Sequence, residues 1–195
     1  MRPGVIGGAN WGGGAFDPNS GLLYVKSSST PAILRLAEPD ESATNPRRDE
    51  VDAALVNRGG DATFMNGLPV LKPPYGHLTA IDLNRGEIAW RVPFGDTPAI
   101  RNHPALKGVP LPARLGASGA PGVIVTAGGL VFGGGGDMAL NAVDAMTGEM
   151  LWRGALSQRT TSTPMTYRAN GRQYVVIATG LGESAEMVAF TTQSR

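Results

Sequence analysis

Short apolar segments recur along most of this chain, separated by Gly, Pro, Asn or Asp. Several of them alternate apolar and polar residues, which is typical of a β-strand with one buried face. The pattern predicts strands in GGGAF, GLLYVKSS, PAILRL, HLTAIDL, EIAWRVPF, GVIVTAGG, LVFGGG, MALNAVDA, EMLWRGA, STPMTYRA, RQYVVIATG and MVAF. Residues 18–21 (PNSG) and the Asn170-Gly171 pair have the composition of hairpin turns. The chain is therefore predicted to be all-β.

One spacing occurs three times: a small residue, any residue, Asp, three residues, Gly, three residues and a bulky residue. The copies are AFDPNSGLLYV from Ala15, AIDLNRGEIAW from Ala80 and AVDAMTGEMLW from Ala142. They lie roughly 60 to 65 residues apart, which is too long for a helical solenoid repeat and suits a four-stranded sheet with insertions. The spacing indicates a repeated hairpin.

Each residue type in this hairpin has a physical reason. The carboxylates of Asp17, Asp82 and Asp144 can accept hydrogen bonds from backbone N–H groups of the turns they open. The Gly that follows supplies the positive φ that closes the turn. Trp90 and Trp152 are predicted to be buried between neighbouring sheets. Because each Asp belongs to a separate hairpin, the three are predicted to be structural and not an acid–base cluster.

Two polar or Pro-rich stretches, residues 37–77 and 95–122, interrupt the strands. We expect them to be loop excursions, with at most a few helical turns, within one segment that spans residues 1–195. The strands then form one interrupted four-stranded unit, one complete unit and one incomplete unit. Radial sheets need roughly 4–8 copies to close into a propeller. The predicted fold is a partial β-propeller of about two and a half to three four-stranded antiparallel blades of a larger ring.

Composition excludes several classes of protein. The 17 basic and 16 acidic side chains nearly balance, which disfavours a nucleic-acid or acidic-membrane surface. The absence of cysteine excludes disulfides and thiolate metal sites. No apolar run approaches the ~20 residues of a membrane span, and the N-terminal MRPGVIGGANWGGG lacks the apolar core of a signal peptide. His77 and His103 are the only histidines and lack zinc-ligand spacing.

Several longer motifs resemble those of the quinoprotein dehydrogenases, in particular the membrane-type quinoprotein glucose dehydrogenases. They are GGANWG at 7–12, KPPYGHLTAIDLNRGEIAW, GDTPAIRNHPALKG, TAGGLVF and STPMTYRANGRQYVVIATG. The resemblance covers nearly the whole chain and only the C-terminal portion of such enzymes. It implies a propeller with pyrroloquinoline quinone (PQQ) on the ring axis beside Ca or Mg. It also implies that the metal ligands and the catalytic base lie mainly outside this chain, and that the location is periplasmic.

The resemblance makes Asn10 and Trp11 the best cofactor-binding candidates. An Asn amide offers both an acceptor and donors to quinone or carboxylate oxygens, although Asn10 could simply serve a turn and Trp11 simply pack. Asp137 is a further cofactor-binding candidate, and its alternative role is to cap the turn of GGGGD at 133–137. That glycine run is not a phosphate loop, because no Lys-Ser/Thr follows it. Thr161 and Thr163 could point hydroxyls to the ring axis or be ordinary strand residues.

Two functions from different classes follow. The first is the C-terminal part of a PQQ-dependent dehydrogenase that oxidises a sugar or alcohol hydroxyl and is inactive as the isolated chain. Missing N-terminal blades or a partner would complete its ring, and no catalytic or metal-ligating residue is predicted within the chain. The second is a non-catalytic propeller scaffold that uses the same hairpins for protein contacts. Fold alone does not separate the two, because propellers host many functions.

Overall fold

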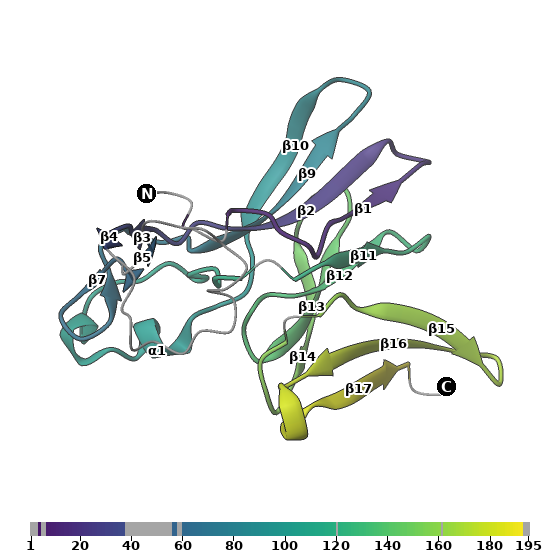
Figure 1. Ribbon diagram of the computed structural model, residues 1–195. Coiled ribbons are helices and arrows are strands. Elements are labelled where there is room, and N and C mark those ends of the chain that lie inside the picture. Colours follow the sequence, from purple (N-terminus) through teal and green to yellow (C-terminus); the bar gives the residue numbers. More distant parts are fainter. Residues whose placement is uncertain are drawn as a thin grey trace.

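The computed structural model describes residues 4, 7–37, 56–57, 60–119, 121–160 and 162–192, with the backbone alone at 36–37 and 56–57. Three antiparallel sheets fan out in succession, and the short strands and α1 gather to one side of them (Figure 1). Neighbouring sheets pack through the side chains on their facing surfaces. The predicted all-β, blade-like architecture is confirmed.

The first sheet has the order β1-β2-β9-β10 and is interrupted in sequence between β2 and β9. Its strands are β1 (Gly14–Asp17), β2 (Leu22–Ser28), β9 (Gly76–Asp82) and β10 (Glu87–Pro93). Every second residue of β2 and of the first part of β9 is buried. This is the alternation that the apolar pattern predicts for strands with one covered face.

The second and third sheets follow without long insertions between their own strands. The second sheet consists of β11 (Val123–Val125), β12 (Leu130–Gly134), β13 (Ala139–Asp144) and β14 (Met150–Ala155), in that order. The third contains β15 (Met165–Ala169), β16 (Arg172–Thr179) and β17 (Glu186–Thr191). The described part of the chain thus contains one interrupted, one complete and one three-stranded sheet, as the sequence predicts.

The excursions are more structured than expected. Three two-stranded ladders pair β3 (Ala32–Ile33) with β6 (Gly60–Asp61), β4 (Leu36–Ala37) with β5 (Val56–Asn57), and β7 (Thr63–Phe64) with β8 (Leu68–Pro69). The expectation of a plain loop at 37–77 was therefore wrong in part, because these strands are too short to show alternation. Helix α1 (Pro98–Arg101) and the 3₁₀ turn η1 (Pro104–Leu106) lie in the second excursion, as expected. A further 3₁₀ turn, η2 (Gly182–Ser184), lies outside both.

The three predicted hairpin turns share one hydrogen-bond pattern. The Oδ1 atom of Asp17 accepts the N–H of Asn19 at 3.0 Å, and the Oδ1 atoms of Asp82 and Asp144 each accept two turn N–H groups at 2.8–3.2 Å. The Gly four residues later has φ values of 71°, 70° and 73° in the three copies. The turn prediction and the structural role of the three Asp residues are confirmed.

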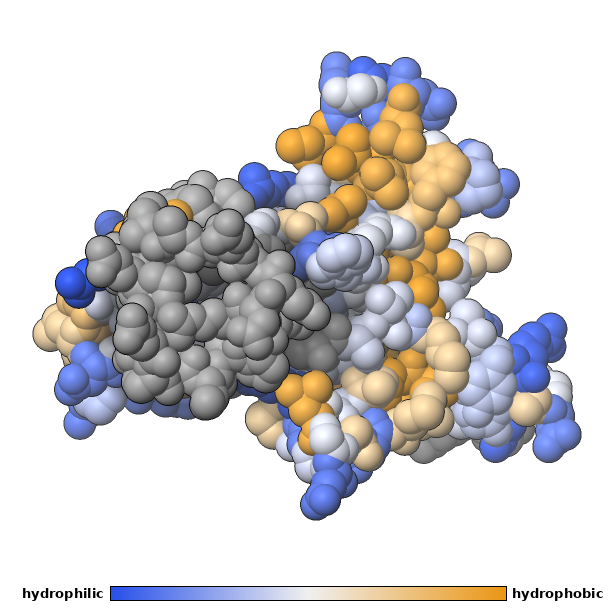
Figure 2. All heavy atoms as spheres, in the orientation of Figure 1, coloured by the Kyte–Doolittle hydropathy of each residue, from blue (hydrophilic) through white to orange (hydrophobic). Residues whose placement is uncertain are grey.

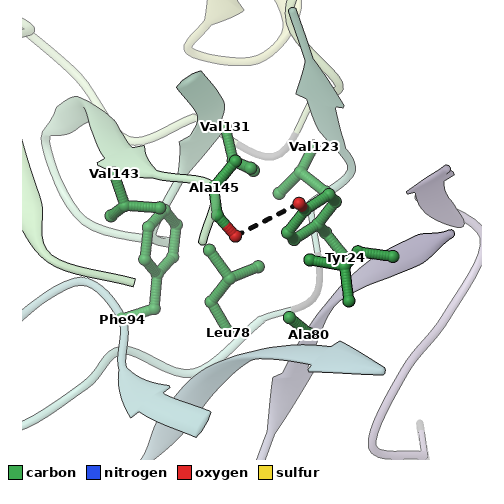
Figure 3. Packing of buried hydrophobic residues seen from close by; sticks show 9 residues of the cluster. Tyr24, Leu78, Ala80, Phe94, Val123, Val131, Val143 and Ala145 are labelled. Atoms are coloured by element: carbon green, nitrogen blue, oxygen red, sulfur yellow. Dashed lines mark hydrogen bonds between the residues drawn. The ribbon is translucent and has the colours of Figure 1, made fainter. Parts of the chain in front are cut away.

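The main core lies between the first and second sheets (Figure 3). Tyr24, Leu78 and Phe94 from the first sheet side meet Val131 and Val143 from the second, and all five are fully buried. The hydroxyl of Tyr24 donates to the carbonyl of Ala145 at 3.1 Å, as the dashed line in Figure 3 marks. Burial of this apolar surface is what holds the first two sheets together.

The two Trp residues of the repeat differ in burial. Trp90 is half-buried beside the main core, and its indole N–H donates to the carbonyl of Ala145 at 3.0 Å. Trp152 contacts Phe190 of the third sheet edge-on at 5.0 Å but remains 40% exposed. The prediction that both are buried was therefore wrong for Trp152, whose ring the contact with Phe190 covers only in part. Within the described residues, no helix has the length and apolar character needed to cross a membrane.

Candidate functional site

The connections between strands fall into two groups, one at each end of the sheets. Because neighbouring strands are antiparallel, the three Asp-x3-Gly turns share one end, which we call the hairpin end. The links after β2, β10, β12 and β14 lie at the opposite end of the sheets, which we call the loop end. A cavity of ≈ 590 Å³ opens among the links of the loop end. This volume is in the range of small-molecule binding sites.

Segments far apart in the sequence line this cavity, which we call the loop-end cavity. They come from the N-terminal segment, the end of β2, β6, the link before β11, the β12–β13 turn and the link after β14. The polar side chains in the lining are those of Asn10, Ser28, Thr30, Asp61, Ser118, Arg159 and Thr160. Glycines at 4, 7, 12, 119 and 136 form much of the remaining wall. Such a surface combines flat backbone walls with a few hydrogen-bonding groups.

Asn10 and Trp11 both line the loop-end cavity. The Oδ1 atom of Asn10 accepts the N–H of Trp11 at 2.9 Å, and its carbonyl accepts the N–H of Gly13 at 3.0 Å, so Asn10 does serve a turn. Trp11, however, is 99% exposed in this chain. An indole that stands free at a cavity wall is available to stack on a planar ligand.

Asp137 lies behind the cavity wall and not in its lining. Its side chain is 1% exposed, while the neighbouring Gly136 lines the cavity. The Oδ2 atom accepts the N–H of Asp96 at 3.1 Å and lies 3.5 Å from Nη2 of Arg153, whereas Oδ1 is buried with no hydrogen-bond partner among the described residues. Asp137 therefore anchors the backbone of the link after β10, and its proposed contact with a cofactor stays a prediction.

Lys26 is a buried cation that sequence reasoning missed. Its ammonium donates to the carbonyls of Ala117 at 2.9 Å and Gly119 at 2.7 Å, and the side chain is 1% exposed. Burial lowers the pKa of Lys26 to about 8, although the nearby carboxylate of Asp137 favours the charged form. Because Gly119 lines the cavity, Lys26 holds one wall in place from behind. The signal was its position: it alternates with Leu22 and Tyr24 on the apolar face of GLLYVKSS.

The link after β14 supplies Arg159 and Thr160 to the lining. Thr160 is fully buried, and its hydroxyl donates to the carbonyl of Ala178 at 2.9 Å. Of the two hydroxyl candidates nearby, Thr163 does not line the cavity, and Thr161 lies outside the described residues. The sequence thus pointed to the right link, and the described residues of that link in the lining are Arg159 and Thr160.

Neither histidine belongs to the cavity. His103 accepts the N–H of Ala105 at 3.2 Å and so caps η1. His77 contacts Arg91 and Ser29, and with Lys72 and Arg91 it lines a separate space on the outer side of the first sheet. Among the residues that the structure describes, no three His, Cys, Asp or Glu side chains come together as a metal site. The polar side chains in the described lining of the loop-end cavity offer amide, hydroxyl, carboxylate and guanidinium groups.

Comparison with known proteins agrees with this geometry. Residues 1–175 match the family described as "PQQ: Glucose/ethanol/alcohol dehydrogenase, beta-propeller domain". The chain is 33% identical to the glycerol dehydrogenase large subunit of Gluconobacter oxydans, over 91% of this chain and 26% of that protein. It is 32% identical to the quinoprotein glucose dehydrogenase of Escherichia coli, over 91% of this chain and 24% of that protein.

A solved structure shows the same arrangement of sheets. The quinohemoprotein alcohol dehydrogenase from Comamonas testosteroni aligns with a TM-score of 0.59 at 27% sequence identity, over 91% of this chain and 23% of that one. The chain thus spans about a quarter of the length of the curated relatives it matches. The resemblance seen in the sequence motifs is confirmed. With a match over most of its length, this chain belongs to the PQQ-dependent glucose, ethanol and alcohol dehydrogenase β-propeller family.

Proposed function

We propose that this chain is the C-terminal part of a PQQ-dependent dehydrogenase that oxidises a sugar or alcohol hydroxyl, and that PQQ binds in the loop-end cavity. The observation that carries the proposal is that Asn10 and the exposed Trp11 ring both line this cavity, in a chain of this family. Its relatives include dehydrogenases of glycerol and of glucose at nearly equal identity, which supports a polyol or sugar as the substrate class.

The lining fits the chemistry of PQQ. The cofactor is a planar ortho-quinone that carries three carboxylates, so it needs a flat slot, hydrogen-bond donors and a cation. The exposed Trp11 ring and the glycine walls suit a planar ring. Gly136 is required for this shape, because a Cβ there would collide with the carbonyl oxygen of Ser118. Arg159 supplies positive charge in the same lining.

This chain's own residues would bind and orient the cofactor. Asn10 would hydrogen-bond its oxygens, and Trp11 would cover one face of the ring and exclude water from it. Bound PQQ supplies the oxidant that takes two electrons from the substrate carbon. The family resemblance assigns Ca or Mg and the catalytic base to residues outside this chain, and the compartment to the periplasm. We therefore expect the isolated chain to bind PQQ weakly and to show no dye-linked oxidation of glucose with calcium supplied.

Further sheets, from missing N-terminal blades or from a partner, would complete the ring. Three sheets are fewer than the roughly 4–8 that close a propeller. Phe16, Leu83 and Ile88 of the first sheet are about half exposed, and apolar residues gather over this sheet in Figure 2. Such a surface suits burial against another sheet. A sharp monomer in size-exclusion chromatography, at every concentration tested, would contradict this part of the proposal.

The cofactor proposal is tested by titrating the chain with PQQ and following tryptophan fluorescence. Asn10→Ala removes one or two hydrogen bonds to the ligand, and we expect it to weaken binding by about 1–3 kcal/mol. Asn19→Ala is the matched control, because Asn19 lies in an exposed turn at the hairpin end. Equal affinity in the Asn10 and Asn19 variants would make Asn10 a turn residue only. Failure of the unaltered chain to bind PQQ would favour the non-catalytic scaffold.

A further inference from the structure

Among the described residues that line the loop-end cavity, Arg159 is the only basic side chain and Asp61 the only acidic one. The structure shows no ion pair for either residue within the described part of the chain. Arg159 is exposed, and only its backbone is engaged, with its carbonyl accepting the N–H of Gly180 at 3.1 Å. A guanidinium in this setting is available to a ligand in the cavity.

Several other arginines are already paired. Arg101 grips Asp96 through two N–H groups at 2.9 and 3.0 Å, and Arg153 lies 3.5 Å from Asp137. Arg85 is 3.0 Å from Glu87. These three guanidinium groups thus each lie against a carboxylate, whereas the guanidinium of Arg159 has no carboxylate partner among the described residues. A planar guanidinium recognises carboxylates by paired, parallel hydrogen bonds.

The backbone on both sides of Arg159 is anchored. The side-chain amide of Gln158 donates to the carbonyl of Ser184 at 2.8 Å, and Thr160 is buried and bonded to the carbonyl of Ala178. A Cβ at Gly134 would collide with Thr160, which shows how closely this link packs on the second sheet. The Cα of Arg159 is therefore held in place while its guanidinium stays uncommitted. Such an arrangement lowers the entropy cost of binding a ligand.

We propose that Arg159 binds a carboxylate of the ligand that lies beside Asn10, so that the loop-end cavity selects planar polycarboxylates. This inference rests on the proposed function, since it assigns one contact to PQQ in the same cavity. Asp61 disfavours a ligand carboxylate on its own side of the cavity, because the two negative charges repel each other. The two residues together would favour one orientation of a tricarboxylate ligand over the other.

The test is a PQQ titration of the 195-residue chain, followed by fluorescence, with Trp11→Phe used to identify which indole reports binding. We expect Arg159→Gln to weaken binding about 10-fold at about 50 mM salt, with a smaller ratio at about 500 mM. Asp61→Asn should strengthen binding. Arg168→Gln is the matched control, because Arg168 is exposed on β15 near the hairpin end and outside the cavity lining. Urea unfolding of each variant checks that the fold is unchanged.

A titration with a second ligand separates the effect of the carboxylate charges from the effect of the ring shape. The trimethyl ester of PQQ keeps the planar ring but has no anionic carboxylates, so we expect the unaltered chain and Arg159→Gln to bind it equally. If Asn10→Ala weakens PQQ binding while Arg159→Gln and Arg168→Gln behave alike, the role of Arg159 is overturned and the proposed function stands. If the unaltered chain does not bind PQQ, both proposals are overturned.

Discussion

The hairpin end and the loop end of the sheets are built in different ways. At the hairpin end, three turns repeat one Asp–backbone hydrogen-bond pattern and one Gly conformation, with φ of 70–73°. At the loop end, each link has its own length and contacts. Lys26, for example, bonds to carbonyls that are 91 and 93 residues away in sequence. At the hairpin end the strands are thus joined by three copies of one turn, whereas at the loop end the links together line a single cavity.

The difference follows from where each backbone group finds its partner. A hairpin turn satisfies its own N–H groups within four residues, so it can be repeated without regard to its neighbours. The cavity wall has carbonyls at Ala117 and Gly119 that are satisfied only by a side chain from another strand. Buried polar groups of this kind are costly when unpaired. A substitution at the loop end should therefore disturb several links at once, whereas a substitution in a hairpin turn should affect mainly that turn.

The largest effect is expected from Lys26→Met at the loop end. The change leaves two backbone carbonyls without their donor and removes the positive charge that faces Asp137. We expect a loss of about 2–4 kcal/mol in the free energy of unfolding, since each unsatisfied buried group costs about 1–3 kcal/mol. Urea unfolding at about pH 7 measures it. Lys107→Met, at an exposed lysine, is the control and should be nearly neutral.

The same variant makes a prediction about pH. Because the pKa of Lys26 is lowered to about 8 in the folded chain from a usual value of 10.5, the unfolded chain binds more protons between these values. The contribution of this group to stability therefore rises with pH across that window. The stability gap between the unaltered chain and Lys26→Met should widen from about pH 8 to about pH 10.5. A constant gap would show that Lys26 is not the titrating group.

A smaller difference is expected between two variants at the hairpin end, Gly148→Ala and Gly86→Ala. Both glycines have positive φ, of 73° and 70°, so both changes introduce strain of roughly 1–2 kcal/mol. A Cβ at Gly148 would also lie 2.7 Å from a ring carbon of Trp90, whereas one at Gly86 meets nothing within 4 Å. Overpacking should add about 1–3 kcal/mol to the first variant only. Equal unfolding midpoints would show that Trp90 moves away without cost.

The smallest effect is expected from Asp144→Asn, measured as acid sensitivity. Hydrogen bonds from the backbone and side chain of Thr147 hold the pKa of Asp144 below its usual value of 3.8. The stabilisation is therefore fully present above pH 3.8 and is lost as the pH falls through the lower, folded-state pKa. Asp144→Asn should flatten this part of the stability–pH curve, as followed by circular dichroism in urea. An unchanged curve would mean that the turn does not depend on the ionised carboxylate.

Much of the fold could be predicted from the sequence because its determinants are local. The Asp17, Asp82 and Asp144 turns, the Asn170-Gly171 hairpin and the strand alternation each depend on residues within a few positions of one another. The strands β5–β8 were missed because two-residue strands show no period, whereas β3 lies within the predicted strand PAILRL. Trp152 was expected to be buried like Trp90, and only the packing of the third sheet against it showed that its ring stays 40% exposed.

For the candidate site, the sequence by itself pointed to Asn10 and Trp11 as the cofactor-binding candidates and to the family, which the comparisons confirm. Only the tertiary structure decided that Arg159, Thr160 and Asp61 join them in one cavity, while Asp137 lies behind the wall. The physical reason is distance along the chain. A turn is specified by hydrogen bonds between near neighbours, but a cavity forms where links from separate sheets meet, and their meeting depends on how the sheets pack.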